Sequence, residues 1–178
     1  SSDLAGFRFA KPTIEDFFES MDHAAVDRLD LHRYMGTWYE IARFDHRFER
    51  GLSEVTATYT LMPDGTVRVE NRGCKHKKPY DVCKTAEGRA KIPDPSQPGK
   101  LKVSFFLSFY SDYYVLELDQ DEYNYALIGS SSDKYLWILS RAPILPEEIK
   151  KKLLDAATRR GYDVKKLIWV EQREKKIM

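Results

Sequence analysis

The chain has 178 residues, enough for one domain with a sizeable core. Hydrophobic residues make up 42% and charged residues 32%, but the formal net charge is only +1, which argues against a nucleic-acid binder with its basic stripe. The sequence also contains no run of about 18 apolar residues, the length that a membrane-spanning helix needs.

Residues 1–27 are expected to form an N-terminal extension apart from the main domain. Thr13 is a suitable N-cap for a short helix there, with Asp16 reaching back to it, and a partly ordered leader is the alternative. Asp30 then predicts one capped helical turn that ends before Gly36.

From Gly36 onward the pattern is that of short strands at hairpin spacing. Apolar residues alternate with polar ones, as in a strand with one buried face, and Met62-Pro63-Asp64-Gly65 has the composition of a turn. The first expected strand starts near Trp38, and the others cover residues 55–61, 66–71, 87–92, 101–107, 113–118, 123–128 and 135–140. The prolines between residues 93 and 98 end the fourth strand because they lack the N–H that a ladder needs.

A single helix follows the strands. Pro146 suits its first turn, Glu147 and Glu148 complement its positive end, and Gly161 ends it. A last short strand at residues 167–170 precedes a charged tail, residues 173–178.

Eight successive antiparallel strands leave two sheet edges, and closure into a barrel removes both. We therefore expect a mainly β fold, in which residues 28–172 form an eight-stranded antiparallel up-and-down barrel with the C-terminal helix packed on its outside. A Greek-key sandwich is less suitable because it usually needs longer crossovers.

Cys74 and Cys83 flank the stretch KHKKPYDV. They predict a disulfide across a hairpin, with two free thiols or, together with His76, part of a metal site as the alternatives. A metal site needs three or four ligands, and no other histidine is near in sequence, so we expect no metal. A disulfide closing so small a loop would contribute about 2–3 kcal/mol and indicate an oxidising compartment.

Three segments resemble motifs of the lipocalin family. GTWYEIAR, which begins at Gly36, and the following FDHRFERG are similar to the first barrel strand of the bacterial branch. DEYNYAL, from Asp121, resembles the motif between strands six and seven, and LWILSR ends in Arg141, where lipocalins place an arginine. The resemblance covers about residues 30–172 and implies a barrel that holds one small hydrophobic ligand.

The resemblance also implies a structural closed end made by Gly36, Trp38, Asp121 and Arg141. Trp38 would plug the barrel and Arg141 would lie across its ring, a contact worth up to about 2 kcal/mol. Gly36 would let the preceding helical turn pass close beneath the floor.

Alternate residues of each strand face the interior of such a barrel. The expected lining is Ala57, Tyr59, Val69, Ala90, Val103, Phe105, Tyr113, Val115, Ile128, Tyr135, Trp137 and Leu139, with further small residues at Ala86 and Gly88. Small residues leave volume and aromatic walls suit a hydrocarbon chain, of which each buried methylene is worth about 0.8 kcal/mol. The alternative is a barrel packed shut by Tyr59, Phe105, Tyr113 and Trp137.

Cations gather in the loops expected at the open end: Arg47, Arg50, Lys75, Lys77 and Lys78. They would attract the carboxylate or phosphate of an amphipathic lipid, or would only solubilise the loops.

We therefore expect a non-enzymatic protein, without a cofactor, that binds fatty acid or lysophospholipid. The resemblance to bacterial outer-membrane lipoproteins implies a place in the cell envelope facing the periplasm, with anchoring through an N-terminal lipid whose attachment cysteine is not in this sequence. The alternatives are a lipocalin-fold enzyme, for which no Ser–His–acid set is evident, and an adhesion module with a closed barrel.

Overall fold

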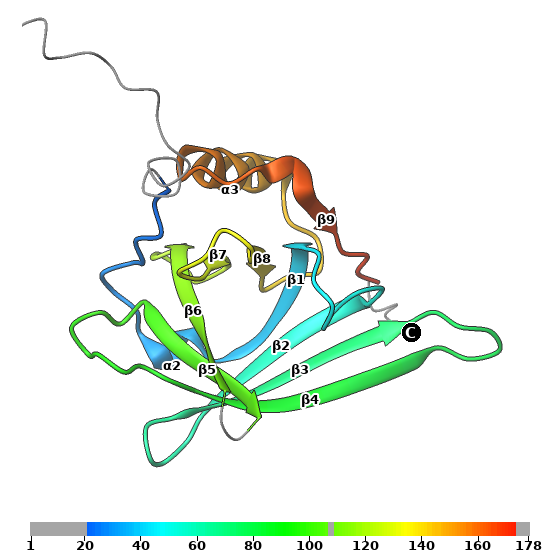
Figure 1. The fold of residues 1–178 in the computed structure, drawn as a ribbon, viewed down its shortest axis with the longest axis horizontal. Coiled ribbons are helices and arrows are strands. Elements are labelled where there is room, and N and C mark those ends of the chain that lie inside the picture. Colours follow the sequence, from blue (N-terminus) through cyan, green and yellow to red (C-terminus); the bar gives the residue numbers. More distant parts are fainter. Residues whose placement is uncertain (1–20, 107–108, 174–178) are drawn as a thin grey trace, which may run out of the picture.

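The structure is a computed structural model that describes residues 21–106 and 109–173. The helix expected from Thr13 and most of the charged tail lie outside these residues. Strands β1 to β8 form one antiparallel barrel, with α3 and the short β9 on its outside (Figure 1). The predicted fold class is therefore confirmed.

Each strand of the barrel pairs with its neighbours in sequence, and β1 closes the ring by pairing with both β2 and β8. The elements are α2 Leu31–Tyr34, β1 Gly36–Phe44, β2 Ser53–Leu61, β3 Val67–Lys75, β4 Val82–Lys91, β5 Lys100–Phe106, β6 Phe109–Leu118, β7 Tyr125–Gly129, β8 Trp137–Ser140, α3 Glu147–Arg159, a 3-10 turn Val164–Lys166 and β9 Leu167–Trp169.

Two hairpins are longer than the sequence predicted. The ladder between β3 and β4 continues past Cys74 and Cys83, which are register partners, so β4 begins five residues before the expected residue 87. β6 likewise begins at Phe109, where a connection was expected, and Lys102 and Asp112 form an ion pair across β5 and β6. Both places are rich in polar residues, a composition typical of turns, and the sequence therefore predicted turns where the structure has paired strands.

Two apolar cores flank the barrel wall. One fills the interior, and the other lies between the outer wall and α3, where Leu153 and Ala157 pack with Leu116, Leu127 and Ile138. Because alternate residues of each strand serve the two cores, the strands near α3 are buried on both faces.

Residues 21–30 run along the barrel beside β6. The Val26 N–H donates to the Val115 carbonyl at 2.9 Å, and the Asp22 N–H donates to the Arg160 carbonyl at 3.0 Å. A side chain at Gly99 would collide with the Val26 carbonyl at 2.6 Å. The described part of the expected extension therefore packs on the barrel, while the division at residue 27 stays a prediction.

Candidate functional site: the barrel interior and its mouth

The connections β2–β3, β4–β5 and β6–β7 lie at one end of the barrel together with α2, and this end is closed. Trp38 is fully buried there and donates from Nε1 to the Tyr34 carbonyl at 2.9 Å. The Arg141 guanidinium lies 3.8 Å from the centre of the Trp38 ring. Its nitrogens also donate to the carbonyls of Arg33, Thr37 and Tyr123, at 2.7, 3.2 and 3.1 Å. One arginine therefore ties three segments over the indole.

Gly36 and Asp121 contribute differently from what the family pattern implied. Gly36 has a φ of +97°, and a Cβ there would lie 3.3 Å from Nη1 of Arg141, so the glycine makes room for that guanidinium rather than for the helical turn. Asp121 contributes its backbone carbonyl, which accepts from Arg33. The carboxylate that organises this turn belongs to Asp119, which accepts from three backbone N–H groups.

Most of the expected lining residues belong to the interior core. Tyr59, Val69, Ala90, Val103, Val115, Ile128 and Leu139 are buried members, and Ala57, Tyr113 and Trp137 are partly buried residues packed against them. Phe105 and Tyr135 are outside this cluster: Phe105 is 37% exposed, and Tyr135 precedes β8 and stacks on Trp137 with ring centres 5.7 Å apart.

Three tyrosines fill the lower interior. The Tyr113 hydroxyl lies 2.6 Å from that of Tyr34 and 2.8 Å from that of Tyr59. Burial raises the pKa of all three, so they remain neutral hydrogen-bonding groups. Since two hydrogen bonds use two of three hydroxyl protons, one proton is left without an acceptor inside this trio.

The cavity beside these tyrosines, toward the floor, is small. Its volume open to water is about 10 Å³, room for about one water molecule. No hydrocarbon chain fits there, so the floor of the barrel is packed as the closed-barrel alternative expected, with Tyr34 in place of Phe105 and Trp137.

The upper interior is different because solvent reaches it. Ala57 is partly exposed, and Ser111 and Ala86, which alternation places on the inner face, are exposed. Gly88 does not add volume as expected: a Cβ there would meet the Ser104 carbonyl at 2.6 Å and the Phe105 ring at 2.8 Å. Phe105 thus covers Gly88 at the edge of this solvent-exposed upper part of the barrel, called the cup below.

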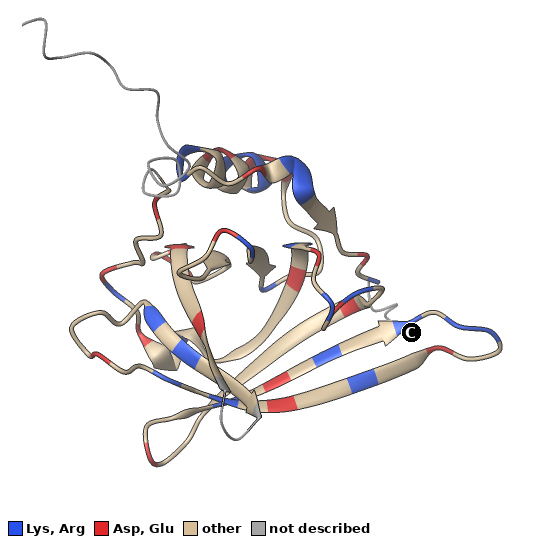
Figure 2. Cartoon of the chain, viewed as in Figure 1, with Lys and Arg blue, Asp and Glu red and all other residues tan. Residues whose placement is uncertain are grey.

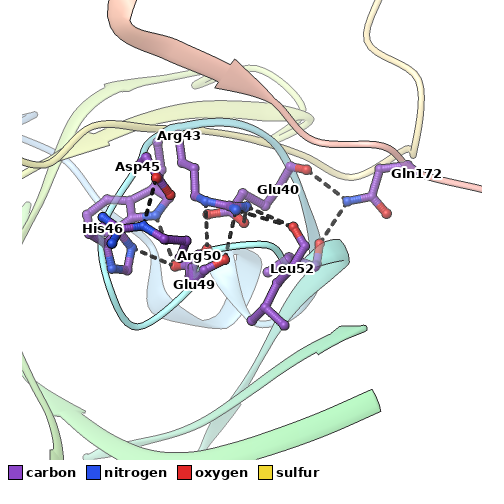
Figure 3. Close-up of polar contacts among 10 residues, drawn as sticks. Glu40, Arg43, Asp45, His46, Glu49, Arg50, Leu52 and Gln172 are labelled. Atoms are coloured by element: carbon purple, nitrogen blue, oxygen red, sulfur yellow. Dashed lines mark hydrogen bonds and ion pairs between the residues drawn. The ribbon is translucent and has the colours of Figure 1, made fainter. Parts of the chain in front are cut away.

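A buried charged cluster, which the sequence did not predict, stands at one wall of this cup (Figure 3). Arg43 is 2% exposed and donates to a Glu40 carboxylate oxygen at 3.4 Å and to the Glu49 and Leu52 carbonyls at 2.8 and 3.2 Å. Glu49 also accepts from Trp137 at 3.3 Å. The cluster therefore ties the β1–β2 loop to the barrel wall.

The two acids of the cluster have opposite pKa shifts. Burial, followed by the nearby Glu49, raises the pKa of Glu40 well above its usual range, against the opposing effect of Arg43. Burial also acts on Glu49 and would raise its pKa, but the contact with His46 and the nearby Glu40 and Arg43 outweigh burial and lower the pKa of Glu49. The Arg43 cation thus lies against two carboxyl groups whose pKa values shift in opposite directions, an arrangement that limits the net charge buried in the cluster.

The mouth cations lie on two connections at the open end. On the β1–β2 loop, Arg50 pairs with Asp45 at 3.1 Å, and the Arg47 guanidinium lies 4.8 Å from the centre of the Phe48 ring. The hairpin between β3 and β4 carries Lys75, Lys77 and Lys78, and lysines mark it in Figure 2. These positions surround the cup, whereas none of them enters the interior core.

The remaining candidates are structural. Cys74 and Cys83 form a disulfide between β3 and β4, with Cα atoms 4.0 Å apart, so neither is a free thiol nucleophile. Within the described ranges, no group of three or more His, Cys, Asp or Glu residues could hold a metal ion. The helices of residues 21–106 and 109–173 include none with the length and apolarity to cross a membrane.

Comparison with known proteins matches the family model of the lipocalin-like domain to residues 29–172. The chain is 50% identical over 147 residues to outer membrane lipoprotein Blc of Escherichia coli K12, covering 83% of this chain and 81% of the relative. It is 42% identical over 158 residues to temperature-induced lipocalin-1 of Arabidopsis thaliana, covering 84% and 82%. Insecticyanin of the tobacco hornworm Manduca sexta has a similar fold, with a TM-score of 0.68, 24% identity and 86% coverage of each chain.

Proposed function

The chain belongs to the lipocalin family, and from this premise we propose that it is a non-enzymatic carrier of a single-chain amphiphile, a fatty acid or lysophospholipid. The proposal is supported by a barrel that is closed at its base and has solvent-exposed inner-face residues toward its other end. Trp38 and Arg141 close the base, while Ala57 and other inner-face residues above the tyrosines stay accessible. An acyl chain entering from the mouth stops at the tyrosine layer.

The upper cup offers both kinds of contact that an amphiphile needs. Ala57 and the partly exposed Trp137 ring supply apolar surface for the chain, at about 0.8 kcal/mol for each buried methylene. Lys75, with its side chain directed over Gly51 on the facing loop, supplies a cation for the head group.

The cell envelope is the proposed location. The bacterial relatives at 46–50% identity are named outer membrane lipoproteins, which supports placement at the outer membrane. The disulfide also fits an oxidising compartment such as the periplasm. Residues 28–172 would be the carrier domain.

The test is a matched pair of substitutions on β2. Ala57 faces the interior, whereas Thr58 faces outward and contacts Thr37. Ala57→Phe should displace at least two methylenes of a bound chain and lower the affinity for oleate by more than about tenfold. Thr58→Phe should leave the affinity unchanged.

Calorimetric titration with oleate and with oleoyl lysophosphatidylglycerol, below the concentrations at which they aggregate, measures both variants. Absence of binding by the unmodified chain, or an equal loss in the two variants, would contradict the proposal.

A further inference from the structure

Large hydrophobic side chains are left exposed mainly around the mouth of the barrel. In the described part of the chain, five of the eight lie at this end: Phe48, Tyr80, Val82, Phe105 and Tyr110. Tyr80 at the tip of the β3–β4 hairpin is 78% exposed, and Phe48 on the β1–β2 loop is 64% exposed. Single exposed hydrophobic residues are ordinary, but a group at one end marks an interaction surface.

Positive charge accompanies these aromatic tips. Residues 75–84 contain four lysines and one aspartate, a net charge of +3 with neutral His76, whereas the whole chain carries only +1. Figure 2 shows the lysines along this hairpin. Among the described residues, Lys77 and Lys78 are exposed and have no carboxylate within 4.0 Å, because Asp81 pairs instead with His76 and Arg173.

We propose that the open end of the barrel docks on an anionic phospholipid bilayer. Tyr80 and Phe48 enter the headgroup region, where aromatic residues are enriched, and Lys77 and Lys78 bind the lipid phosphates. Lysine is depleted at protein–protein interfaces, so a lysine-rich rim with aromatic tips fits a lipid surface better than a protein partner.

Docking in this orientation would turn the cup toward the bilayer. Figure 1 shows the β3–β4 hairpin extending beyond the rest of the barrel, with α2 at the opposite end of the strands. A lipid could then pass between bilayer and cup without crossing bulk water. The inference goes beyond the proposed function, because the rim can bind a bilayer whether or not the cup takes a lipid.

Vesicle flotation with the full chain tests the charge contribution. Vesicles of phosphatidylcholine alone are compared with vesicles that also contain phosphatidylglycerol. Replacing Lys77 and Lys78 together with Ser should reduce partitioning to the anionic vesicles about 30-fold at low salt, since each lysine near such a surface contributes about fivefold. The difference should shrink at high salt.

A matched control is available on α3. Lys151 and Lys152 are also adjacent and exposed, but Lys152 contacts Tyr125, the first residue of β7 at the closed end of the barrel. Replacing both with Ser should leave partitioning unchanged. The proposal is overturned if the unmodified chain fails to float with anionic vesicles, if it binds both vesicle types equally, or if the two double variants lose binding equally.

Insertion is tested separately from charge. A tryptophan placed by Tyr80→Trp should be quenched by phospholipids with brominated acyl chains, whereas one placed by Ile144→Trp, at an exposed site outside the mouth, should not. Equal quenching of the two would overturn the proposed orientation. Oleate titration of the same variants distinguishes the two proposals. If vesicle binding is lost while oleate binding is intact, the carrier function is supported without docking. If oleate binding is lost while vesicle binding is intact, docking is supported without the carrier function.

Discussion

Replacement of Arg141 by Met tests the claim that one arginine holds the barrel floor together. The substitution keeps the aliphatic stem but removes the donors to the carbonyls of Arg33, Thr37 and Tyr123 and the charge over Trp38. A hydrogen bond from a charged donor is worth about 1.5–3 kcal/mol, and we take about 1 kcal/mol for each here because the site is partly exposed. With about 0.5–1 kcal/mol for the cation–π contact, the expected loss is about 3–4 kcal/mol.

Urea unfolding followed by tryptophan fluorescence measures this loss as a lower midpoint at an unchanged slope. For a chain of this size it corresponds to a fall in Tm of about 10 °C. Arg68→Met is the control, because Arg68 forms an exposed pair with Glu87 whose loss should cost at most about 1 kcal/mol. If Arg141→Met costs no more than Arg68→Met, the assigned role is wrong.

Two further predictions concern the mouth. The raised pKa of Glu40 means that the folded protein keeps a proton that the unfolded chain releases above about pH 4.3, so this group's contribution to stability falls as pH rises from there toward the raised pKa. Glu40→Gln removes that dependence. The urea midpoint of this variant should therefore rise relative to that of the unmodified chain as the pH increases from about 4 to about 8, and a difference between the two midpoints that does not change with pH would contradict the pKa shift. Replacing Cys74 and Cys83 together with Ser should cost about 2–3 kcal/mol, and a loss below about 1 kcal/mol would rule out the loop-closure argument.

The strands and most inward faces could be predicted because alternation is a local signal. In β3, for example, Val67 and Val69 alternate with Arg68 and Glu70, which identifies the buried face without knowledge of its partners. Trp38 and Arg141 needed the family motif as well, because 103 positions separate them in the sequence and nothing local indicates their contact.

The sequence did not predict the charged cluster, and the reason is geometric. Glu40 and Arg43 are three positions apart, so strict alternation would place them on opposite faces. The register of β1 with β8 shifts between Glu40 and Ala42, and this bulge brings both side chains to the same wall. The sequence did not predict Tyr34 as an interior residue because it belongs to a short helical turn, and its hydrogen-bond partner Tyr113 is 79 residues away.

The pairing of β1 also constrains how the chain can fold. Arg43 in β1 is the register partner both of Trp137 in β8 and of Ile168 in β9, so the first strand pairs with segments that follow it by about 90 residues or more. Such distant pairing slows folding, because closing a long loop costs chain entropy before the contacts between the strands can stabilise the closed state. A fragment that stops before β8 would present β1 as an uncovered edge, open to pairing with other copies. Productive folding of the barrel therefore waits until β8 and β9 have been synthesised.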